Sequence, residues 1–454
     1  MNMGYYWAHS MVQWEHDLKV WFVSRRGTEA LGQKIYHSLD EVPEKIDYAI
    51  IAVPWKYVPG VIQECVQKGA KCATIFTSGF AELEDDEGIQ REQELKELIH
   101  SLPIRVLGPN CMGLTNPKLG FAFMPTAKRL AGDVGFISQS GGVAIATYTA
   151  GVASGVGFSK LFSFGNQIDI SSTEILSYFE FDDETKVVGA YIEGTKNGKE
   201  FFEALKSLAA KKPVVVLKGG RSLAGSRAAA SHTGALAGSR DIWNTAFKQA
   251  NVTTVETLED MVATLSLFSL SPAPRSRDLG LIAISGGTSV IYTDLCLDMG
   301  LGVPSTSPET VKKLDPLIKD VGTGLGNPID MAADYYHDQT VGEVIRIAGE
   351  DPNFGSLIIE ADVHNIHQVS TIMDAADVVD GFWNVMADAA KGVVEKEKKP
   401  VLIAVPEVAY PEARNLAWNI FIDRGLPVFR NFREAAGALK RVSIFHEIQD
   451  RRNS

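Results

Sequence analysis

The fold class is indicated first by the stretch Lys45-Ile-Asp-Tyr-Ala-Ile-Ile-Ala-Val-Pro54. Its apolar run has the length of a strand and is continuous from Tyr48 to Val53. A helical segment at about 59–68 follows, then an apolar run at 72–77, a helix rich in Glu and Lys at about 87–100, and a third run at 104–107. Continuous apolar strands that alternate with helices are typical of a parallel sheet covered on both faces. We therefore predict a doubly wound α/β fold.

Two stretches mark candidate domain boundaries. Residues 122–132 precede a new strand, and residues 269–277 read Ser-Leu-Ser-Pro-Ala-Pro-Arg-Ser-Arg, which is the composition of a linker. Because domains average ~150 residues, a chain of 454 residues has room for about three. The predicted domains are residues 1–126, 127–272 and 273–454.

The second and third of these domains are predicted to repeat one another. Gly135-Phe-Ile-Ser-Gln-Ser-Gly-Gly142 matches Gly280-Leu-Ile-Ala-Ile-Ser-Gly-Gly287. Three further pairs follow in the same order: 166–169 with 327–330, 191–193 with 358–360, and 212–214 with 399–401. One short match would mean little, but four in a fixed order indicate two copies of one α/β unit.

Composition narrows the class of partner. The chain is 45% hydrophobic and 22% charged, as is usual for a globular protein, and no apolar stretch approaches the ~18 residues that span a bilayer. The net charge of −12 argues against a nucleic-acid partner. The start of the chain has no signal-peptide pattern. The four cysteines form no CxxC pair and no metal-ligand spacing, so we predict a reduced, cytoplasmic protein with no metal site.

Each copy of the repeat carries Ser-Gly-Gly where a strand turns into a helix. The first N–H groups of a helix lack partners, its dipole adds positive charge, and glycine allows an anion close to the backbone. Both turns are therefore candidate phosphate sites, although a tight turn also needs glycine for packing. The candidate residues are Ser138, Ser140, Gly141 and Gly142 in the first copy and Ser285, Gly286, Gly287 and Thr288 in the second.

Only the first copy contains the loop Ser231-His-Thr-Gly-Ala-Leu-Ala-Gly-Ser239. Its residues are mostly small, so we expect His232 to be exposed and mobile. An imidazole is nucleophilic near neutral pH and can accept a phosphoryl group and pass it on. His232 is therefore the candidate phosphate carrier, and a surface or capping histidine is the alternative interpretation.

This loop resembles the phosphohistidine loop of ADP-forming acetyl-CoA synthetases, which are relatives of succinyl-CoA synthetase. Four other segments are similar to that family in the same order: Gly108-Pro-Asn-Cys-Met-Gly113, 136–142, 164–169 and 191–194. The resemblance implies a Rossmann-like CoA-binding domain followed by two flavodoxin-like domains. It also implies that Glu193 hydrogen-bonds His232, which would fix the imidazole tautomer and raise its nucleophilicity. Pairing with a lysine such as Lys196 is the alternative role for Glu193.

The resemblance places coenzyme A in the first domain. Family members open with a strand and a glycine-rich turn for the CoA phosphates, whereas this sequence begins at Met1-Asn-Met-Gly4 and continues into a helix-like stretch. Either the start of the reading frame is set late or CoA binding is degraded. Arg25 or Arg26 would pair with a CoA phosphate, with an ordinary solvated basic pair as the alternative. The candidate CoA contacts are Gly4, Ser24, Arg25, Arg26, Val53, Pro54, Ser78, Gly79, Asn110 and Cys111.

We find no nucleotide-binding motif. Gly194-Thr-Lys-Asn-Gly-Lys-Glu200 is one residue too short for a phosphate-binding loop and ends in Glu where Ser or Thr is required. The resemblance implies that Mg-ATP or Mg-ADP binds to a separate ATP-grasp beta subunit in an α₂β₂ assembly.

We predict a subunit of a nucleoside-diphosphate-forming acyl-CoA synthetase (acid + CoA + ATP = acyl-CoA + ADP + phosphate) that works through a phosphohistidine. A non-catalytic or regulatory CoA-binding protein derived from the same family is the alternative. A succinate-specific subunit fits less well, because the histidine loop and the third domain are closer to the acetate-type enzymes.

Overall fold

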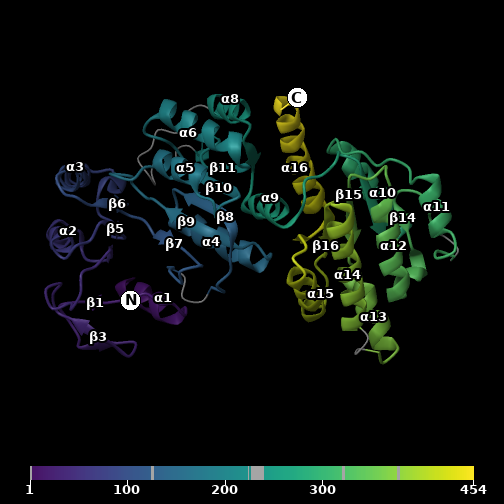
Figure 1. Ribbon diagram of the computed structural model, residues 1–454, viewed down its shortest axis with the longest axis horizontal. Helices are drawn as coiled ribbons and strands as arrows, with labels where there is room; N and C mark the ends of the chain where they lie inside the picture. The colour runs from purple at the N-terminus through teal and green to yellow at the C-terminus, as the bar shows by residue number, and fades with distance from the viewer. Residues whose placement is uncertain are drawn as a thin grey trace. The chain divides into compact units, whose positions relative to one another are not determined.

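The computed structural model describes residues 3–123, 127–222, 224–225, 240–319, 323–375 and 379–453. The chain divides into two compact units (Figure 1): Met1–Val152 with Gly157–Glu256, and Ala153–Val156 with Thr257–Ser454. Parallel sheets with helices between their strands confirm the predicted α/β class. The three domain ranges stay a prediction. His232 and the rest of 226–239 lie outside the described residues.

The first unit opens with helix α1 (Met3–Gln13), in agreement with the helix-like start of the sequence. A small sheet follows, formed by β1 (Phe22–Val23), β2 (Glu29–Ala30) and β3 (Gln33–Tyr36). The next three strands are parallel and enclose two helices: β4 (Tyr48–Ile51), α2 (Val58–Gln67), β5 (Cys72–Ile75), α3 (Asp86–His100) and β6 (Arg105–Leu107). Ile51, Ile75 and Val106 are fully buried, as the apolar runs predicted.

The larger sheet of the first unit has the order β12-β11-β10-β8-β9-β7. Its strands are β7 (Gly113–Thr115), β8 (Ala131–Ser138), β9 (Phe158–Ser163), β10 (Val187–Ile192), β11 (Val214–Lys218) and β12 (Thr253–Val255). The helices are α4 (Gly141–Ala153), α5 (Ser172–Phe181), α6 (Gly198–Lys211) and α8 (Arg240–Ala250). Apart from the antiparallel edge strand β7, the strands run parallel in the flavodoxin-like order 2-1-3-4-5.

The second unit contains a second sheet of the same order, β14-β13-β15-β16-β17, with all its strands parallel. Its strands are β13 (Leu279–Ala283), β14 (Ile329–Asp330), β15 (Ser356–Glu360), β16 (Val401–Ala404) and β17 (Val428–Phe429). The helices are α9 (Leu258–Leu270), α10 (Gly286–Asp298), α11 (Pro308–Leu314), α12 (Asp338–Glu350), α13 (Val363–Ile372), α14 (Val379–Glu397), α15 (Pro411–Asp423) and α16 (Phe432–Asn453). Two apolar clusters cover opposite faces of the sheet. The predicted repeat is therefore confirmed by strand order.

The Lys-Pro-Val element of the repeat has one physical role in both copies. Lys212 Nζ donates to the carbonyl oxygens of Phe179 (2.5 Å) and Asp182 (2.6 Å), at the end of α5. Lys399 Nζ donates to those of Gly349 (2.8 Å) and Asp351 (2.6 Å), at the end of α12. The last carbonyls of a helix have no partner within the helix, and a cation there also suits the helix dipole. Lys212 thus anchors the end of α5 to the start of β11, and Lys399 anchors the end of α12 to the start of β16.

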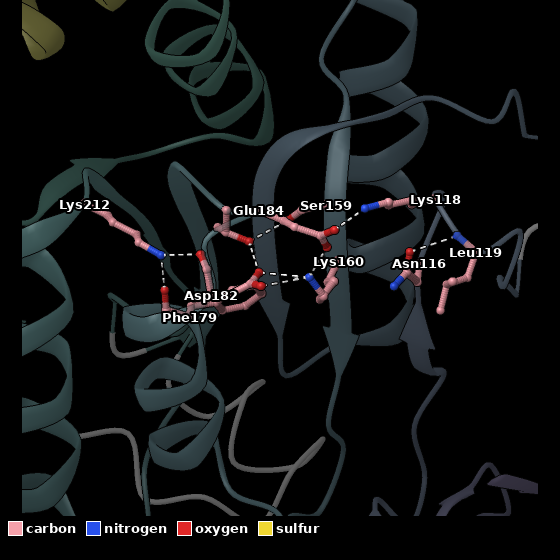
Figure 2. A network of polar contacts seen from close by, with 10 residues as sticks. Asn116, Lys118, Leu119, Ser159, Lys160, Phe179, Asp182, Glu184 and Lys212 are labelled. Carbon is pink, nitrogen blue, oxygen red and sulfur yellow. Dashed lines mark hydrogen bonds and ion pairs between the residues drawn. The ribbon is translucent and has the colours of Figure 1, made fainter. Parts of the chain in front are cut away.

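A polar network joins β9 to the segment after α5 (Figure 2). Lys160 Nζ lies 3.0 Å from the Asp182 carboxylate and 2.7 Å from that of Glu184, to which Lys118 also donates. Burial raises the pKa of Asp182, but hydrogen bonds from Thr185 and Lys160 outweigh this effect and lower it. Asp182 is therefore an ionised acceptor that depends on its donors.

No helix within these described ranges is both long and apolar enough to cross a bilayer.

We expect Lys160→Met to lower the free energy of unfolding by about 1 to 3 kcal/mol, because the carboxylate of Asp182, whose side chain is 9% exposed, loses a charged donor. Lys118→Met is the matched control, since it removes another Glu184 partner; the Lys118 side chain is 67% exposed, against 12% for Lys160. The control should change the free energy by no more than about 0.5 kcal/mol. Urea unfolding measures both. Equal losses in the two variants would show that burial of Lys160 is unimportant.

Candidate functional site

The strand order places a crevice at the carboxyl ends of β8 and β10. The chain leaves these neighbouring strands toward opposite edges of the sheet, and ligands of doubly wound folds bind where this happens. Ser138 ends β8, and Glu193 directly follows β10. Two of the predicted site elements therefore meet at the position that the topology favours.

The turn after β8 separates residues that shape the site from those that face it. Ser138 is fully buried; its Oγ donates to the Ser140 carbonyl oxygen (2.6 Å) and accepts from the Ser140 N–H (3.2 Å). A Cβ on Gly141 would lie 2.6 Å from Met112 Cγ, whereas a Cβ on Gly142 would meet nothing closer than 3.8 Å. Gly141 is therefore required by packing. Gly142 leaves the N-terminus of α4 open to a ligand.

Gln139, which the sequence analysis did not single out, ties this turn to Glu193. Its Oε1 accepts from the N–H groups of Glu193 (2.8 Å) and Gly194 (3.1 Å), and its side chain is buried. One amide oxygen thus fixes the end of β10 relative to the start of α4. The sequence feature that could have identified Gln139 is its position as a polar residue between two serines in a glycine turn.

The Glu193 carboxylate is 4% exposed and has one oxygen to spare. Oε1 accepts from the Tyr191 hydroxyl (2.9 Å), while Oε2 has no hydrogen-bond partner among the residues that the structure describes. Burial and the Glu193 charge raise the pKa of Tyr191, which keeps its hydroxyl a donor. Lys196 Nζ donates instead to the Gln167 carbonyl oxygen (3.0 Å), so the alternative pairing of Glu193 with Lys196 is not observed. Glu193 is therefore available to a donor such as an imidazole.

Lys218 is a second residue that the sequence analysis did not single out. It ends β11, and its Nζ donates to the carbonyl oxygens of Glu193 (2.6 Å) and Gly219 and lies 5.0 Å from the centre of the Trp243 ring. Burial lowers the pKa of Lys218 to about 8, although the charge of Glu193 acts in the opposite direction. A lysine that ends an otherwise apolar strand was the signal.

A cavity of about 500 Å³ opens beside the N-terminus of α4. The loops after β4, β5 and β6 form one wall, and the turn after β8 forms another. The structure therefore brings part of the predicted CoA site and the first predicted phosphate site into one cavity. The predicted residues that line it are Val53, Pro54, Ser78, Asn110, Cys111, Ser140, Gly141 and Gly142, together with Trp55, Phe76, Met112, Gln139 and Asn166 among others.

Hydrogen bonds hold these loops in register. Thr77 Oγ1 donates to the Val53 carbonyl oxygen (2.6 Å), and the Asn110 N–H donates to the Thr77 carbonyl oxygen (3.0 Å). Asn110 adopts a left-handed φ of 57°, which asparagine tolerates better than most residues. Burial raises the pKa of the Cys111 thiol to about 12, so Cys111 packs as a neutral side chain. Asn110 is therefore the polar group of this loop that can meet a ligand.

Asn166 connects this wall to helix α3. Its Nδ2 donates to Glu82 Oε2 (2.6 Å) and Glu92 Oε2 (2.7 Å), and its backbone N–H donates to the Pro109 carbonyl oxygen (3.0 Å). The sheet formed by β4, β5 and β6 and the larger sheet are thus joined at the cavity wall.

The other predicted CoA contacts lie outside the cavity wall as the described residues define it. Gly4 is in α1, and Gly79 packs against Trp55, since a Cβ there would lie 3.0 Å from Trp55 Cδ1. Ser24 Oγ accepts from the Arg26 N–H (3.2 Å). The Arg25 guanidinium lies 5.3 Å from the centre of the Tyr57 ring, and both arginines are exposed. These residues could meet only a more distant part of a long ligand.

The second predicted phosphate turn lies in the second unit, at the start of α10. Ser285 is the N-cap residue, and Thr288 Oγ1 donates to the Ser285 carbonyl oxygen (2.9 Å). A Cβ on Gly286 would lie 3.1 Å from Asp330 Oδ2, whereas one on Gly287 would lie 3.8 Å from its nearest neighbour. As in the first copy, the first glycine is confined by packing and the second is open. Among the described residues, no group of three or more His, Cys, Asp or Glu side chains is arranged to hold a metal ion.

Two protein-family models match the chain. Residues 1–117 match the model of a CoA binding domain, and residues 131–268 match that of the succinyl-CoA ligase like flavodoxin domain. The chain resembles the solved structure of the dinucleotide forming acetyl-coenzyme A synthetase 1 of Ca. Korarchaeum cryptofilum in complex with phosphate and ADP. The TM-score is 0.83 at 28% identity, with 99% of this chain and 93% of that chain covered.

Curated relatives give the same result. The chain is 37% identical over 347 residues to the alpha subunit of ADP-forming acetate–CoA ligase II from Pyrococcus furiosus, with 75% of this chain and 74% of the relative covered. It is 32% identical over 452 residues to the alpha subunit of ligase I from that organism, with 98% and 93% covered. An ADP-forming acetate–CoA ligase of Methanocaldococcus jannaschii is 38% identical over 70% of this chain, which spans only 44% of that longer relative. The chain belongs to the family of ADP-forming acetate–CoA ligase alpha subunits, which are acid–thiol ligases.

Proposed function

We propose that this ligase subunit works through a phosphohistidine formed at His232, within the overall reaction acid + CoA + ATP = acyl-CoA + ADP + phosphate. One observation carries the proposal. One cavity joins the predicted CoA loops to the open N-terminus of α4, and the neighbouring strand is followed by the buried Glu193, one oxygen of which has no partner among the described residues. The naming of the relatives as ligases favours this function over a non-catalytic CoA-binding protein.

The reaction is described in the direction that starts from acyl-CoA, which is the reverse of the equation as written. The first step joins phosphate to the acyl group. A phosphate oxygen attacks the thioester carbonyl carbon of acyl-CoA, the carbon–sulfur bond breaks, and CoA leaves as a thiolate that takes up a proton. The first N–H groups of α4, with Ser140, Gly141 and Gly142, would hold the phosphate and stabilise its charge. Val53, Pro54, Ser78, Asn110 and Cys111 would position the thiol end of CoA, and Ser24, Arg25 and Arg26 its phosphates.

The second step moves the phosphoryl group to the protein. A nitrogen of His232 attacks phosphorus, the bond to the acyl oxygen breaks, and the acid leaves as a carboxylate. Glu193 Oε2 would accept a hydrogen bond from the other ring nitrogen, which orients the imidazole and stabilises its positive charge. The phosphohistidine then gives its phosphoryl group to ADP and the free imidazole returns.

The resemblance to the family also supports a proposal for the nucleotide and the rest of the assembly. We place Mg-ATP or Mg-ADP on a separate ATP-grasp beta subunit and the complex, an α₂β₂ heterotetramer, in the cytoplasm. The alpha-subunit names of two relatives and the greater length of others support a partner. We place the limits between the CoA-binding part and the two flavodoxin-like parts at residues 126 and 272.

Lys218 would keep Glu193 in place during both steps. Its ammonium group bonds the Glu193 carbonyl oxygen and adds positive charge beside the carboxylate.

Incubation with radiolabelled acyl phosphate, or with labelled ATP and the partner subunit, should label wild-type protein with the acid-labile, base-stable signature of phosphohistidine. His232→Ala should not be labelled, and Glu193→Gln should be labelled about 100-fold more slowly. His100→Ala, which removes an exposed histidine at the end of α3, should behave as wild type. Equal labelling of wild type and His232→Ala would refute the proposal.

Lys218 also makes stability depend on pH in a defined window. Its folded pKa of about 8 is below the ordinary value of 10.5, so the unfolded chain binds more protons between these values. Relative to Lys218→Met, the free energy of unfolding of the wild type should therefore rise from about pH 8 to 10. Urea unfolding across this range measures the difference. Lys199→Met, at an exposed position, controls for the loss of a positive charge. A difference that falls with pH would contradict the burial of Lys218.

A further inference from the structure

Asn110 has an unusual backbone conformation at the wall of the cavity. Its φ of 57° is left-handed, a conformation that costs a non-glycine residue energy and that often occurs at active sites. The Asn110 N–H donates to the Thr77 carbonyl oxygen at 3.0 Å. The Asn110 carbonyl oxygen packs against Gly165, where a Cβ would lie 2.6 Å from that oxygen. Both backbone groups therefore face neighbouring segments, and the carboxamide is the part of Asn110 that remains to line the cavity.

The Asn110 carboxamide is available to a ligand. The side chain is half-buried, and its amide makes no hydrogen bond to the residues that the structure describes. Two other donors of the cavity wall are already used. Asn166 Nδ2 donates to the carboxylates of Glu82 and Glu92. The Thr77 hydroxyl donates to a backbone carbonyl oxygen. Asn110 therefore offers the cavity an N–H donor that no described residue occupies.

The loop that carries Asn110 is fixed against the start of α4. The Met112 N–H donates to Ser163 Oγ at 3.2 Å, at the end of β9. The Met112 side chain packs on Gly141, the first residue of α4, where a Cβ would lie 2.6 Å from Met112 Cγ. Asn110 and the first turn of α4 line the same cavity. The amide donor is therefore held in place in the cavity that contains the first predicted phosphate site.

The proposed first step creates a negative charge on an oxygen outside the phosphate. Hydrogen phosphate at the start of α4 attacks the thioester carbonyl carbon, and the carbonyl π electrons move onto oxygen. The first N–H groups of α4 bond the phosphate oxygens in this step, so the carbonyl oxygen needs a donor from another part of the wall. A fixed donor at such an oxygen is worth about 100- to 1,000-fold in kcat.

We propose that Asn110 is a catalytic residue, whose Nδ2 donates a hydrogen bond to the thioester carbonyl oxygen and stabilises the tetrahedral intermediate. When the intermediate collapses, the carbonyl re-forms and the carbon–sulfur bond breaks, with its electron pair on sulfur. The proton of hydrogen phosphate ends on the CoA thiolate, so acyl phosphate and CoA are the products. Asn110 keeps its own hydrogens throughout. The inference rests on the proposed function in taking phosphate attack on acyl-CoA as the first step.

Two substitutions separate hydrogen-bond donation from loop shape. Asn110→Gly removes the donor and adopts the left-handed φ without strain, whereas Asn110→Asp keeps the size but has only acceptors when ionised. Release of free CoA is measured by chromatography in the complete enzyme, with its partner subunit, Mg-ADP, acetyl-CoA and phosphate. We expect kcat to fall by about 100-fold in Asn110→Gly and by more in Asn110→Asp. A residue needed only for the shape of the loop would tolerate aspartate at least as well as glycine.

Asn251→Gly is the matched control. Asn251 also has a left-handed φ, of 58°, but it lies between α8 and β12 and does not line the cavity. This variant should keep the kcat of the wild type. If Asn110→Gly fails to fold, the loss in Asn110→Asp still tests the donor. CoA release near the wild-type rate in either Asn110 variant, or faster release in Asn110→Asp than in Asn110→Gly, would overturn the inference.

Labelling of His232 from acetyl phosphate distinguishes this inference from the proposed function. That step attacks phosphorus and forms no tetrahedral carbon, so Asn110→Gly should slow labelling far less than CoA release. Equal losses of both would contradict the role of Asn110. Absence of labelling in the wild type, with CoA release that still depends on Asn110, would count against the phosphohistidine and leave the donor standing.

Discussion

The main constraint on the structure is that the backbone N–H groups at the start of α4 and α10, directly after β8 and β13, have no acceptor within their own helix. The first turn of a helix has donors that no residue of the helix can satisfy. In both units the chain leaves these strands at the point where strand order reverses, so the donors face a crevice and not a packed neighbour. In the first unit the glycine turn after β8 keeps these donors accessible, and the other groups of the candidate site are arranged around it.

The buried carboxylate of the first unit is held mainly through its backbone. Gln139 receives the Glu193 N–H, and Lys218 donates to the Glu193 carbonyl oxygen. The side chain itself has only Tyr191 as a described partner. The peptide is therefore fixed from two neighbouring strands, while one carboxylate oxygen remains unused. This combination suits a group whose partner arrives and leaves during the reaction.

Sequence patterns predicted the strands, the repeat and the position of the glycine turns, because each depends on local composition or on order along the chain. They missed Gln139 and Lys218, whose roles depend on the register of β8 and β11 against β10. They also could not separate Gly141 from Gly142, since only the nearby Met112 distinguishes them. Ser138 was grouped with the ligand-facing residues, but its hydroxyl is used within its own turn. Contacts across strands decide such roles, and a single sequence does not contain them.

The paired lysines of the repeat bear on how the chain arose. Lys212 bonds two carbonyl oxygens at the end of α5, and Lys399 bonds two at the end of α12. The same contact is more readily inherited from a common ancestor than evolved twice. It therefore indicates that an ancestral domain, which already contained the five-stranded parallel sheet, was duplicated. The segment Ser231–Ser239 then distinguishes the two copies, since the stretch that follows β16 in the second copy contains no histidine.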